Sequence, residues 1–346
     1  MQSLLPALAW AIFVTGLATG GAQAHPPALE RTRFLMGTTC RIQAHVPGED
    51  PAAIEGALDA IARLEDELST WRADSPLSRF NGAAGGAPSP VAPSLLRFLV
   101  DCRTWSERTQ GAFDPVVGAL VDAWDLRGTG RRPSAPELRQ ARARSGMRLL
   151  EIDVATASAR LTHAGAWLDS GGIAKGLALD VAARELRARG ISDALLDFGG
   201  QVLVLGTPAE ADAWTVAIAD PTARERPALV LDLTQGSVST SAQSERGVVV
   251  NGQLLGHVLD PRTGRPVDTQ ASVTALAPNG QDADALSTAL LVMGPDVGLR
   301  WIRKHSGLGF EAGYLIPRSE GGLDLRASPG FFRVLRLHAD GVTLLP

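Results

Sequence analysis

Apolar side chains recur at every third or fourth position in four parts of the chain, and this spacing predicts amphipathic helices. A glycine at position 190 ends the third of them. The predicted helices cover residues 51–70, about 93–109, 175–190 and about 283–293. Strands are predicted over residues 31–46, 194–205, much of 214–273, and near 314–316 and 331–345.

The segments between these elements complete the predicted fold. Residues 166–168 predict the end of a strand that leads into the third helix, and Gly199-Gly200 interrupts the next strand, where glycine suggests close backbone approach. Residues 111–115 close the second helix, and residues 122–136 form a polar excursion rich in proline and glycine. Because strands and helices mix without strict alternation, the pattern predicts an α+β fold.

Composition narrows the class of protein. The 346 residues are 45% apolar and carry a formal net charge of −4. This balance supports one large domain or two smaller ones and gives no indication of nucleic-acid binding. No internal repeat or low-complexity segment interrupts the pattern. The chain is therefore expected to be globular throughout.

The first 24 residues contain no charged side chain and are apolar from Leu4 to Leu17. They end in Ala-Gln-Ala, a small-x-small site that predicts a signal peptide (residues 1–24) cleaved near Ala24. The predicted location is therefore the periplasm, with residues 25–346 as the mature protein. An uncleaved membrane anchor is the alternative, although the apolar run is short for a transmembrane helix.

The cysteines and histidines, and the absence of one serine motif, argue against a disulfide and against two classes of hydrolase. Cys40 and Cys102 lie far apart in sequence, which favours two independent apolar residues over a disulfide, although one bridge could form in an oxidising compartment. The histidines have no metal-ligand spacing, which argues against a zinc hydrolase. No Gly-x-Ser-x-Gly motif occurs, which argues against a serine hydrolase.

Residues 169–176 (Asp-Ser-Gly-Gly-Ile-Ala-Lys-Gly) combine a carboxylate, glycines and a lysine at the predicted start of the third helix. The first N–H groups of a helix have no internal partner and favour an anion, and glycine lets a ligand approach the backbone. The order is not that of a Walker A loop, and no Gly-x-Gly-x-x-Gly occurs. The octet indicates a phosphate and metal site, or an ordinary turn with a solvated Lys175.

Asp284 and Thr288 are four residues apart, which places them on one face of the fourth helix. A carboxylate and a hydroxyl are oxygen ligands of the kind that Mg²⁺ prefers, with further donors needed from carbonyls, water or phosphate. The open carbonyls around Gly172 could supply one. Alternatively, Asp282 or Asp284 caps the helix and Thr288 bonds back to its own turn.

His257 begins the segment His-Val-Leu-Asp-Pro-Arg-Thr-Gly, which runs from a strand into a turn. Asp-Pro-x-Thr-Gly is favourable turn chemistry and explains every residue of the segment except the histidine. An imidazole can carry a proton at neutral pH. His257 is therefore a candidate proton carrier, or a packed and hydrogen-bonded residue at a strand end.

Together these segments resemble the ApbE family of FAD:protein FMN transferases over nearly all of the mature chain. The shared motifs, in chain order, are residues 36–38 (Met-Gly-Thr), 69–71 with 75–81, 111–115 (Gly-Ala-Phe-Asp-Pro), 169–176, 197–200, 239–241, 257–264 and 283–288. So many motifs in the family's order make a chance match very improbable. The resemblance implies an ApbE-like, T-fold-related α+β fold of mixed sheets with flanking helices, in one large catalytic unit over residues 25–346.

The resemblance also implies roles for individual residues. The positions implied to contact FAD are Met36, Trp71, Ala112, Phe113, Asp114, Asp169 and Lys175, with Met36 and Trp71 flanking its rings. Magnesium would be held by the Gly172 carbonyl, Asp284 and Thr288, and His257 would accept the proton of the target hydroxyl. The catalytic set is therefore His257, Asp284 and Lys175.

Three positions depart from the family pattern. Ser170 replaces Leu, and Trp71 replaces Tyr but keeps a stacking face. Asp197 replaces Asn and adds a carboxyl, which puts in doubt either its ionisation or its closeness to FAD.

The family reaction moves FMN from FAD to a threonine or serine hydroxyl of an acceptor flavoprotein and releases AMP. Family acceptors are membrane-associated flavoproteins of respiratory complexes or their regulators. Two alternatives remain open at the level of sequence: a pyrophosphatase of the same fold that splits FAD to FMN and AMP, and a periplasmic flavin-binding protein without catalysis.

Overall fold

The computed structural model describes residues 28–244, 247–250 and 252–345. The predicted signal peptide, with its cleavage site near Ala24, lies outside these residues. Within the described part of the chain, no helix is both long and apolar enough to cross a membrane.

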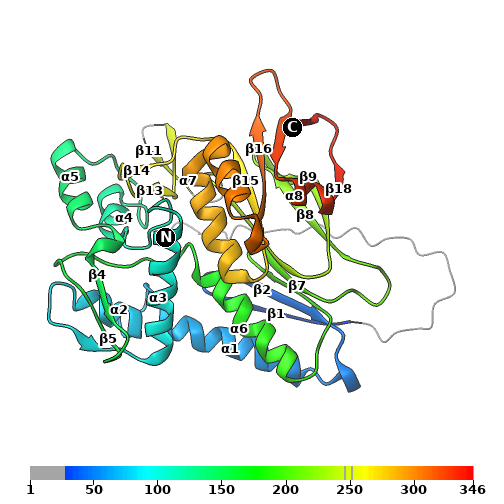
Figure 1. Ribbon diagram of the computed structural model, residues 1–346, viewed down its shortest axis with the longest axis horizontal. Coiled ribbons are helices and arrows are strands. Elements are labelled where there is room, and N and C mark those ends of the chain that lie inside the picture. The colour runs from blue at the N-terminus through cyan, green and yellow to red at the C-terminus, as the bar shows by residue number, and fades with distance from the viewer. Residues whose placement is uncertain (1–27, 245–246, 251, 346) are drawn as a thin grey trace, which may run out of the picture.

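A nine-stranded sheet forms the centre of the molecule (Figure 1). Its neighbours pair antiparallel except for the last two strands, which are parallel. In spatial order the strands are β1 (Leu29–Leu35), β2 (Thr38–Ala44), β6 (Ala194–Phe198), β7 (Gln201–Leu205), β10 (Gly236–Ala242), β15 (Ser272–Ala277), β16 (Glu311–Pro317), β17 (Leu323–Ala327) and β19 (Val342–Leu345).

Different layers cover the two faces of this sheet. Leu196 and Leu203 pack under helices α1 (Ala52–Leu68) and α6 (Ala174–Ala188), and α7 (Gly280–Lys304) lies beside α6 in Figure 1. Their neighbours Leu195, Val202 and Val204 point the other way because side chains alternate along a strand. They pack against a three-stranded sheet formed by β18 (Leu335–His338), β9 (Ala223–Leu233) and β8 (Trp214–Asp220), near the short helix α8 (Pro329–Val334).

Four helices and several short strands lie at one end of the large sheet (Figure 1). The helices are α2 (Pro76–Gly82), α3 (Pro93–Arg108), α4 (Gly118–Trp124) and α5 (Ala135–Ala143). The strands are β3 (Ser89–Pro90), β4 (Leu150–Asp153), β5 (Ser158–Leu161), β11 (Gly247–Val250), β12 (Gln253–Gly256), β13 (Leu259–Asp260) and β14 (Arg265–Pro266). The Trp124 indole N–H donates to the Gly264 carbonyl at 2.8 Å and joins α4 to the β13–β14 hairpin. The predicted α+β class is confirmed.

Several predicted elements differ in the structure. Residues 31–46 contain two strands, because Met36 and Gly37 both take positive φ (46° and 75°), as a tight hairpin turn requires. The predicted strand end at 166–168 is wrong: Leu168 belongs to no strand, and its N–H and carbonyl bond to the Asn81 side chain. Helices α2 and α5 were not predicted, and α4 runs into the predicted polar excursion.

The C-terminal third also differs from the prediction. Helix α7 extends beyond the predicted 283–293, because Gly294 turns the backbone (φ 73°) and Pro295 then starts a second helical stretch. The predicted terminal strand at 331–345 is divided among α8, β18 and β19, and β17 was not predicted. Cys40 and Cys102 are both free and buried, so the prediction of independent cysteines is confirmed.

Asp180 gives the fold a pH-dependent stability. Its carboxylate accepts hydrogen bonds from the N–H groups of Gly280 (2.6 Å) and Gln281 (2.9 Å) at the start of α7. Burial nevertheless raises the pKa of Asp180 from 3.8 to about 6. Such a shift stabilises the fold fully below pH 3.8, and the stabilisation is lost as the pH rises through about 6.

The free energy of unfolding of the wild type should therefore fall as the pH rises through this range. In Asp180→Asn we expect this fall to be smaller, by at most about 3 kcal/mol. Urea denaturation of both proteins at several pH values from about 3 to about 7, a range that spans both pKa values, measures the difference. An unchanged slope in the variant would show that Asp180 does not titrate in this way.

Candidate active site

The start of α6 lies against the start of α7, and glycines permit this close approach. A Cβ atom on Gly176 would overlap the Gly280 carbonyl, and a Cβ atom on Gly280 would overlap the Gly176 carbonyl oxygen. Any side chain at either position would separate the helices. The octet 169–176 is thereby held beside the first turns of α7, which carry Asp284 and Thr288.

Asp284 is buried at this junction with only 4% of its surface exposed. Its Oδ2 accepts a hydrogen bond from the Gly176 N–H at 3.0 Å, so it bonds the first turn of α6 and does not cap its own helix. Burial raises the pKa of the Asp284 carboxyl, while the Lys175 ammonium and the backbone N–H groups of Gly176 and Lys175 lower it. The cap of α7 is Asn279, which exchanges hydrogen bonds with Asp282.

Gly172, Thr288 and Phe113 meet beside Asp284. A Cβ atom on Gly172 would lie 3.2 Å from the Thr288 Oγ1 and 3.4 Å from the Phe113 ring. The structure therefore brings together a hydroxyl, a glycine backbone and a buried carboxylate, which are hard oxygen donors. A buried carboxylate with a raised pKa is a group that a cation would stabilise, so these residues fit the magnesium that the family resemblance implies.

Lys175 lies in the first turn of α6, half-buried, and its charge acts on both Asp284 and Asp197. It is one of two lysines in the chain, the other being Lys304. Burial raises the pKa of Asp197, while the Gly200 N–H, Arg41 and Lys175 lower it. Asp197, which replaces the family's Asn, is thus close to basic side chains. Their positive charge reduces the repulsion between its carboxylate and a phosphate.

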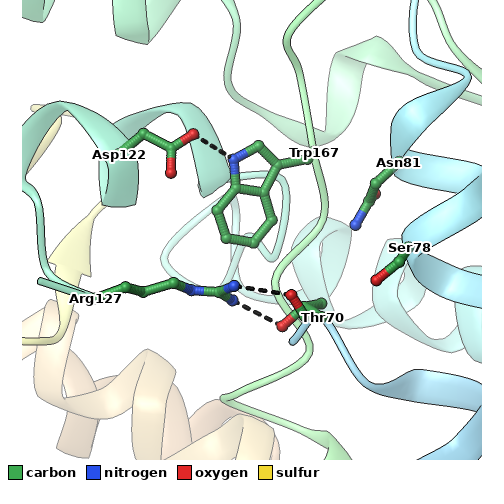
Figure 2. Close-up of a pocket in the computed structure, with 6 residues that line it drawn as sticks. All are labelled: Thr70, Ser78, Asn81, Asp122, Arg127 and Trp167. Atoms are coloured by element: carbon green, nitrogen blue, oxygen red, sulfur yellow. Dashed lines mark hydrogen bonds between the residues drawn. The ribbon is translucent and has the colours of Figure 1, made fainter. Parts of the chain in front are cut away.

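Asp169 and Trp71 lie at the outer side of the octet. The Asp169 Oδ1 accepts a hydrogen bond from the Gly171 N–H at 2.9 Å, and its Oδ2 pairs with Arg127 at 3.1 Å. Trp71 is 75% exposed, with the Arg127 guanidinium over its ring at 4.6 Å. A small pocket beside them is formed by Thr70, Ser78, Asn81, Asp122, Arg127 and Trp167 (Figure 2).

The remaining predicted FAD contacts have clear structural roles. Met36 is half-buried in the β1–β2 turn, and Ala112 and Phe113 are buried. The two Asp114 oxygens accept hydrogen bonds from the N–H groups of Val116 (2.9 Å) and Met147 (2.7 Å). Burial raises the pKa of Asp114 despite these two bonds. Asp114 thus holds the backbone in this region, whether or not it also meets a ligand.

His257 is half-buried, and the next residue in the chain, Val258, is held by Gln243. The buried Gln243 amide exchanges hydrogen bonds with the backbone of Val258 at 2.8 and 3.0 Å. Gln243 directly follows β10, whose Ser241 hydroxyl bonds to Ser287 of α7 at 2.9 Å. The segment that carries His257 is therefore tied to the strand that packs beside the Asp284–Thr288 face.

Arg127 and Gln243 are the two residues of this region that sequence reasoning did not identify. Arg127 lies in the predicted polar excursion, and nothing local marks it out. Gln243 lies two residues after the predicted motif 239–241, but its role depends on a backbone segment fifteen residues away.

The fold and this constellation define a member of a known family. Residues 36–310 match the model of the ApbE family, and the chain belongs to it. The FAD:protein FMN transferase of Treponema pallidum (strain Nichols) is 32% identical over 342 residues, covering 93% of this chain and 92% of that protein. The FAD:protein FMN transferase of Escherichia coli (strain K12) is also 32% identical over 342 residues, covering 94% and 95%.

Solved structures agree with this assignment. The ApbE protein of Thermotoga maritima MSB8 superposes with a TM-score of 0.81 at 29% identity, covering 90% of this chain and all of that one. The flavin transferase ApbE of Vibrio cholerae gives a TM-score of 0.77 at 28% identity, covering 89% and 100%. The prediction of an ApbE-family enzyme is confirmed, whereas the individual site residues remain predictions.

Proposed function

We propose that this protein transfers FMN from FAD to a threonine or serine hydroxyl of an acceptor flavoprotein, with release of AMP, in a magnesium-dependent reaction. Relatives covering almost the whole chain are named FAD:protein FMN transferases. The observation that carries the proposal is the meeting of Asp284, Thr288 and Gly172 beside Lys175 at the α6–α7 junction. A protein that only bound flavin would not require this set of oxygen donors.

The reaction breaks one phosphoanhydride bond of FAD and forms one phosphoester bond to the acceptor oxygen. Magnesium, when bound by the Gly172 carbonyl, Asp284 and Thr288, would offset the negative charge of the pyrophosphate. Lys175 places a further positive charge at the same helix start, where the dipole of α6 also favours an anion. His257 accepts the proton that the acceptor hydroxyl loses.

The FAD site itself would extend from this junction to the outer side of the octet. Met36 and Trp71 would flank the rings, while Asp169 and residues 112–114 would contact the dinucleotide.

We also propose that the protein is exported to the periplasm after cleavage near Ala24. Its acceptor there would be a membrane-associated respiratory flavoprotein or its regulator.

Intact-mass spectrometry of candidate acceptors, incubated with enzyme, FAD and Mg²⁺, tests the proposal. We expect the acceptor to gain one FMN and AMP to appear in equal amount. Free FMN with no labelled acceptor would indicate FAD pyrophosphatase activity instead. FAD that survives long incubation would indicate a binding protein without catalysis.

We expect Lys175→Met to lower kcat for FMN transfer by about 100-fold, because a fixed positive charge near the developing phosphate charge is lost. Steady-state AMP release measures the effect. Lys304→Met, at the exposed end of α7, is the matched control and should retain wild-type kcat. Equal rates in the two variants would remove Lys175 from the catalytic set.

A further inference from the structure

The guanidinium of Arg127 lies over two indole rings beside the candidate site. Its Cζ is 4.6 Å from the centre of the Trp71 ring and 4.4 Å from that of Trp167. It also donates hydrogen bonds to the Thr70 carbonyl (3.0 Å) and the Thr70 Oγ1 (2.7 Å), as Figure 2 shows. Stacking and planar hydrogen bonding together fix the guanidinium in one orientation.

The same guanidinium forms an ion pair with the octet. Its Nη2 lies 3.1 Å from the Asp169 Oδ2, and the two side chains are only 25% and 23% exposed. The other oxygen of the same carboxylate, Asp169 Oδ1, accepts a hydrogen bond from the Gly171 N–H. The ion pair therefore also helps to fix the backbone just before Gly172. One cation thus joins three segments: the end of α1, the loop after α4, and the octet.

The two indoles differ in how they are held. Trp167 is fixed, because its N–H donates to Asp122 at 2.7 Å and its ring packs on Gly118, where any Cβ atom would overlap it. Trp71 is 75% exposed and has the Arg127 guanidinium as its stacking partner. Arg127 therefore sets the position of Trp71 against a fixed support and leaves the rest of the Trp71 ring accessible.

We propose that Arg127 is a positioning residue for the flavin dinucleotide. This inference rests on the proposed function, in which Trp71 and Asp169 contact FAD. Arg127 holds the Trp71 ring as a platform for stacking, and it neutralises the Asp169 carboxylate, which would otherwise repel the phosphates of FAD. It acts through these two residues on binding and takes no part in the transfer of the phosphoryl group.

The test separates binding from chemistry. We expect Arg127→Ala to raise KM for FAD at least about tenfold while kcat stays within about threefold, because the lost contacts serve binding. Quenching of tryptophan fluorescence by FAD, without acceptor, should give the same loss in affinity. Arg127→Lys should recover part of it, because lysine keeps the charge but lacks the planar fork.

Arg131→Ala is the matched control, because Arg131 follows in the same loop but pairs with Glu137 on the surface. It should bind FAD as the wild type does. In Trp71→Ala, the further loss caused by Arg127→Ala should be smaller than in the wild type, because Arg127 acts partly through that ring.

Wild-type FAD affinity in a folded Arg127→Ala protein would overturn the inference, and so would a fall in kcat at unchanged KM. If Arg127→Ala does not fold, KM, kcat and FAD affinity measured on Arg127→Lys test the inference instead. A wild-type protein that binds FAD but transfers no FMN would defeat the proposed function and leave the positioning role standing. A wild-type protein that does not bind FAD would defeat both.

Discussion

Asp284→Asn is expected to abolish FMN transfer, with a loss of at least about a thousandfold in kcat/KM. The substitution keeps an oxygen that can accept the Gly176 hydrogen bond, so the contact between α6 and α7 survives. It removes the buried negative charge, which is the feature that would attract a cation. AMP release and acceptor mass measure activity, and circular dichroism with thermal melting measures folding.

Asp282→Asn is the matched control. This carboxylate lies two residues earlier on the same helix, but its hydrogen bonds come from the Asn279 side chain and the Trp105 indole N–H, whereas Asp284 accepts one from Gly176 of the octet. We expect it to keep near wild-type transfer. A folded Asp284→Asn protein that modifies the acceptor at the wild-type rate would refute the metal assignment.

His257→Ala is expected to lower kcat for FMN transfer by about 10²- to 10⁴-fold, the usual contribution of a general base. FAD binding should change little, because the role assigned to His257 concerns the acceptor hydroxyl. If a neutral imidazole accepts the proton, wild-type kcat/KM rises with pH on the acid side and this rise is absent in the variant. Rates measured from pH 5.5 to 8.5, roughly the working range of an imidazole, test both points.

His163→Ala serves as its control, because that histidine is exposed on a turn after β5. It should leave both the rate and the pH profile unchanged. If His257→Ala transfers FMN with the wild-type pH profile, another group accepts the proton.

Local sequence was sufficient to predict how the residues at the centre of the candidate site are arranged along their helices. The glycines and Lys175 of the octet lie at a helix start, and the four-residue spacing of Asp284 and Thr288 places both on one face of α7. These relations depend on helical geometry within a few residues, which a sequence shows directly. The meeting of the two helices follows from Gly176 and Gly280, whose importance appears only when the helices cross.

Other parts of the site depend on contacts between distant segments. Arg127 has its role because the end of α1, the loop after α4 and the octet converge on it, and no local pattern records this. The apolar sequence at residues 166–168 resembled a strand, but the backbone of Leu168 bonds to the Asn81 side chain. At Gly294 and Pro295 the sequence predicted a stop, whereas a positive φ at the glycine lets the helix resume.

Anomalous diffraction from crystals of the protein with FAD and Mn²⁺ tests the central claim most directly. Mn²⁺ replaces Mg²⁺ at oxygen sites and scatters anomalously. We predict one strong peak between the Gly172 carbonyl, Asp284 and Thr288, with the FAD pyrophosphate beside it and Lys175 within reach. A peak elsewhere with FAD remote from the start of α6, or FAD bound with no metal near Asp284, would contradict the account.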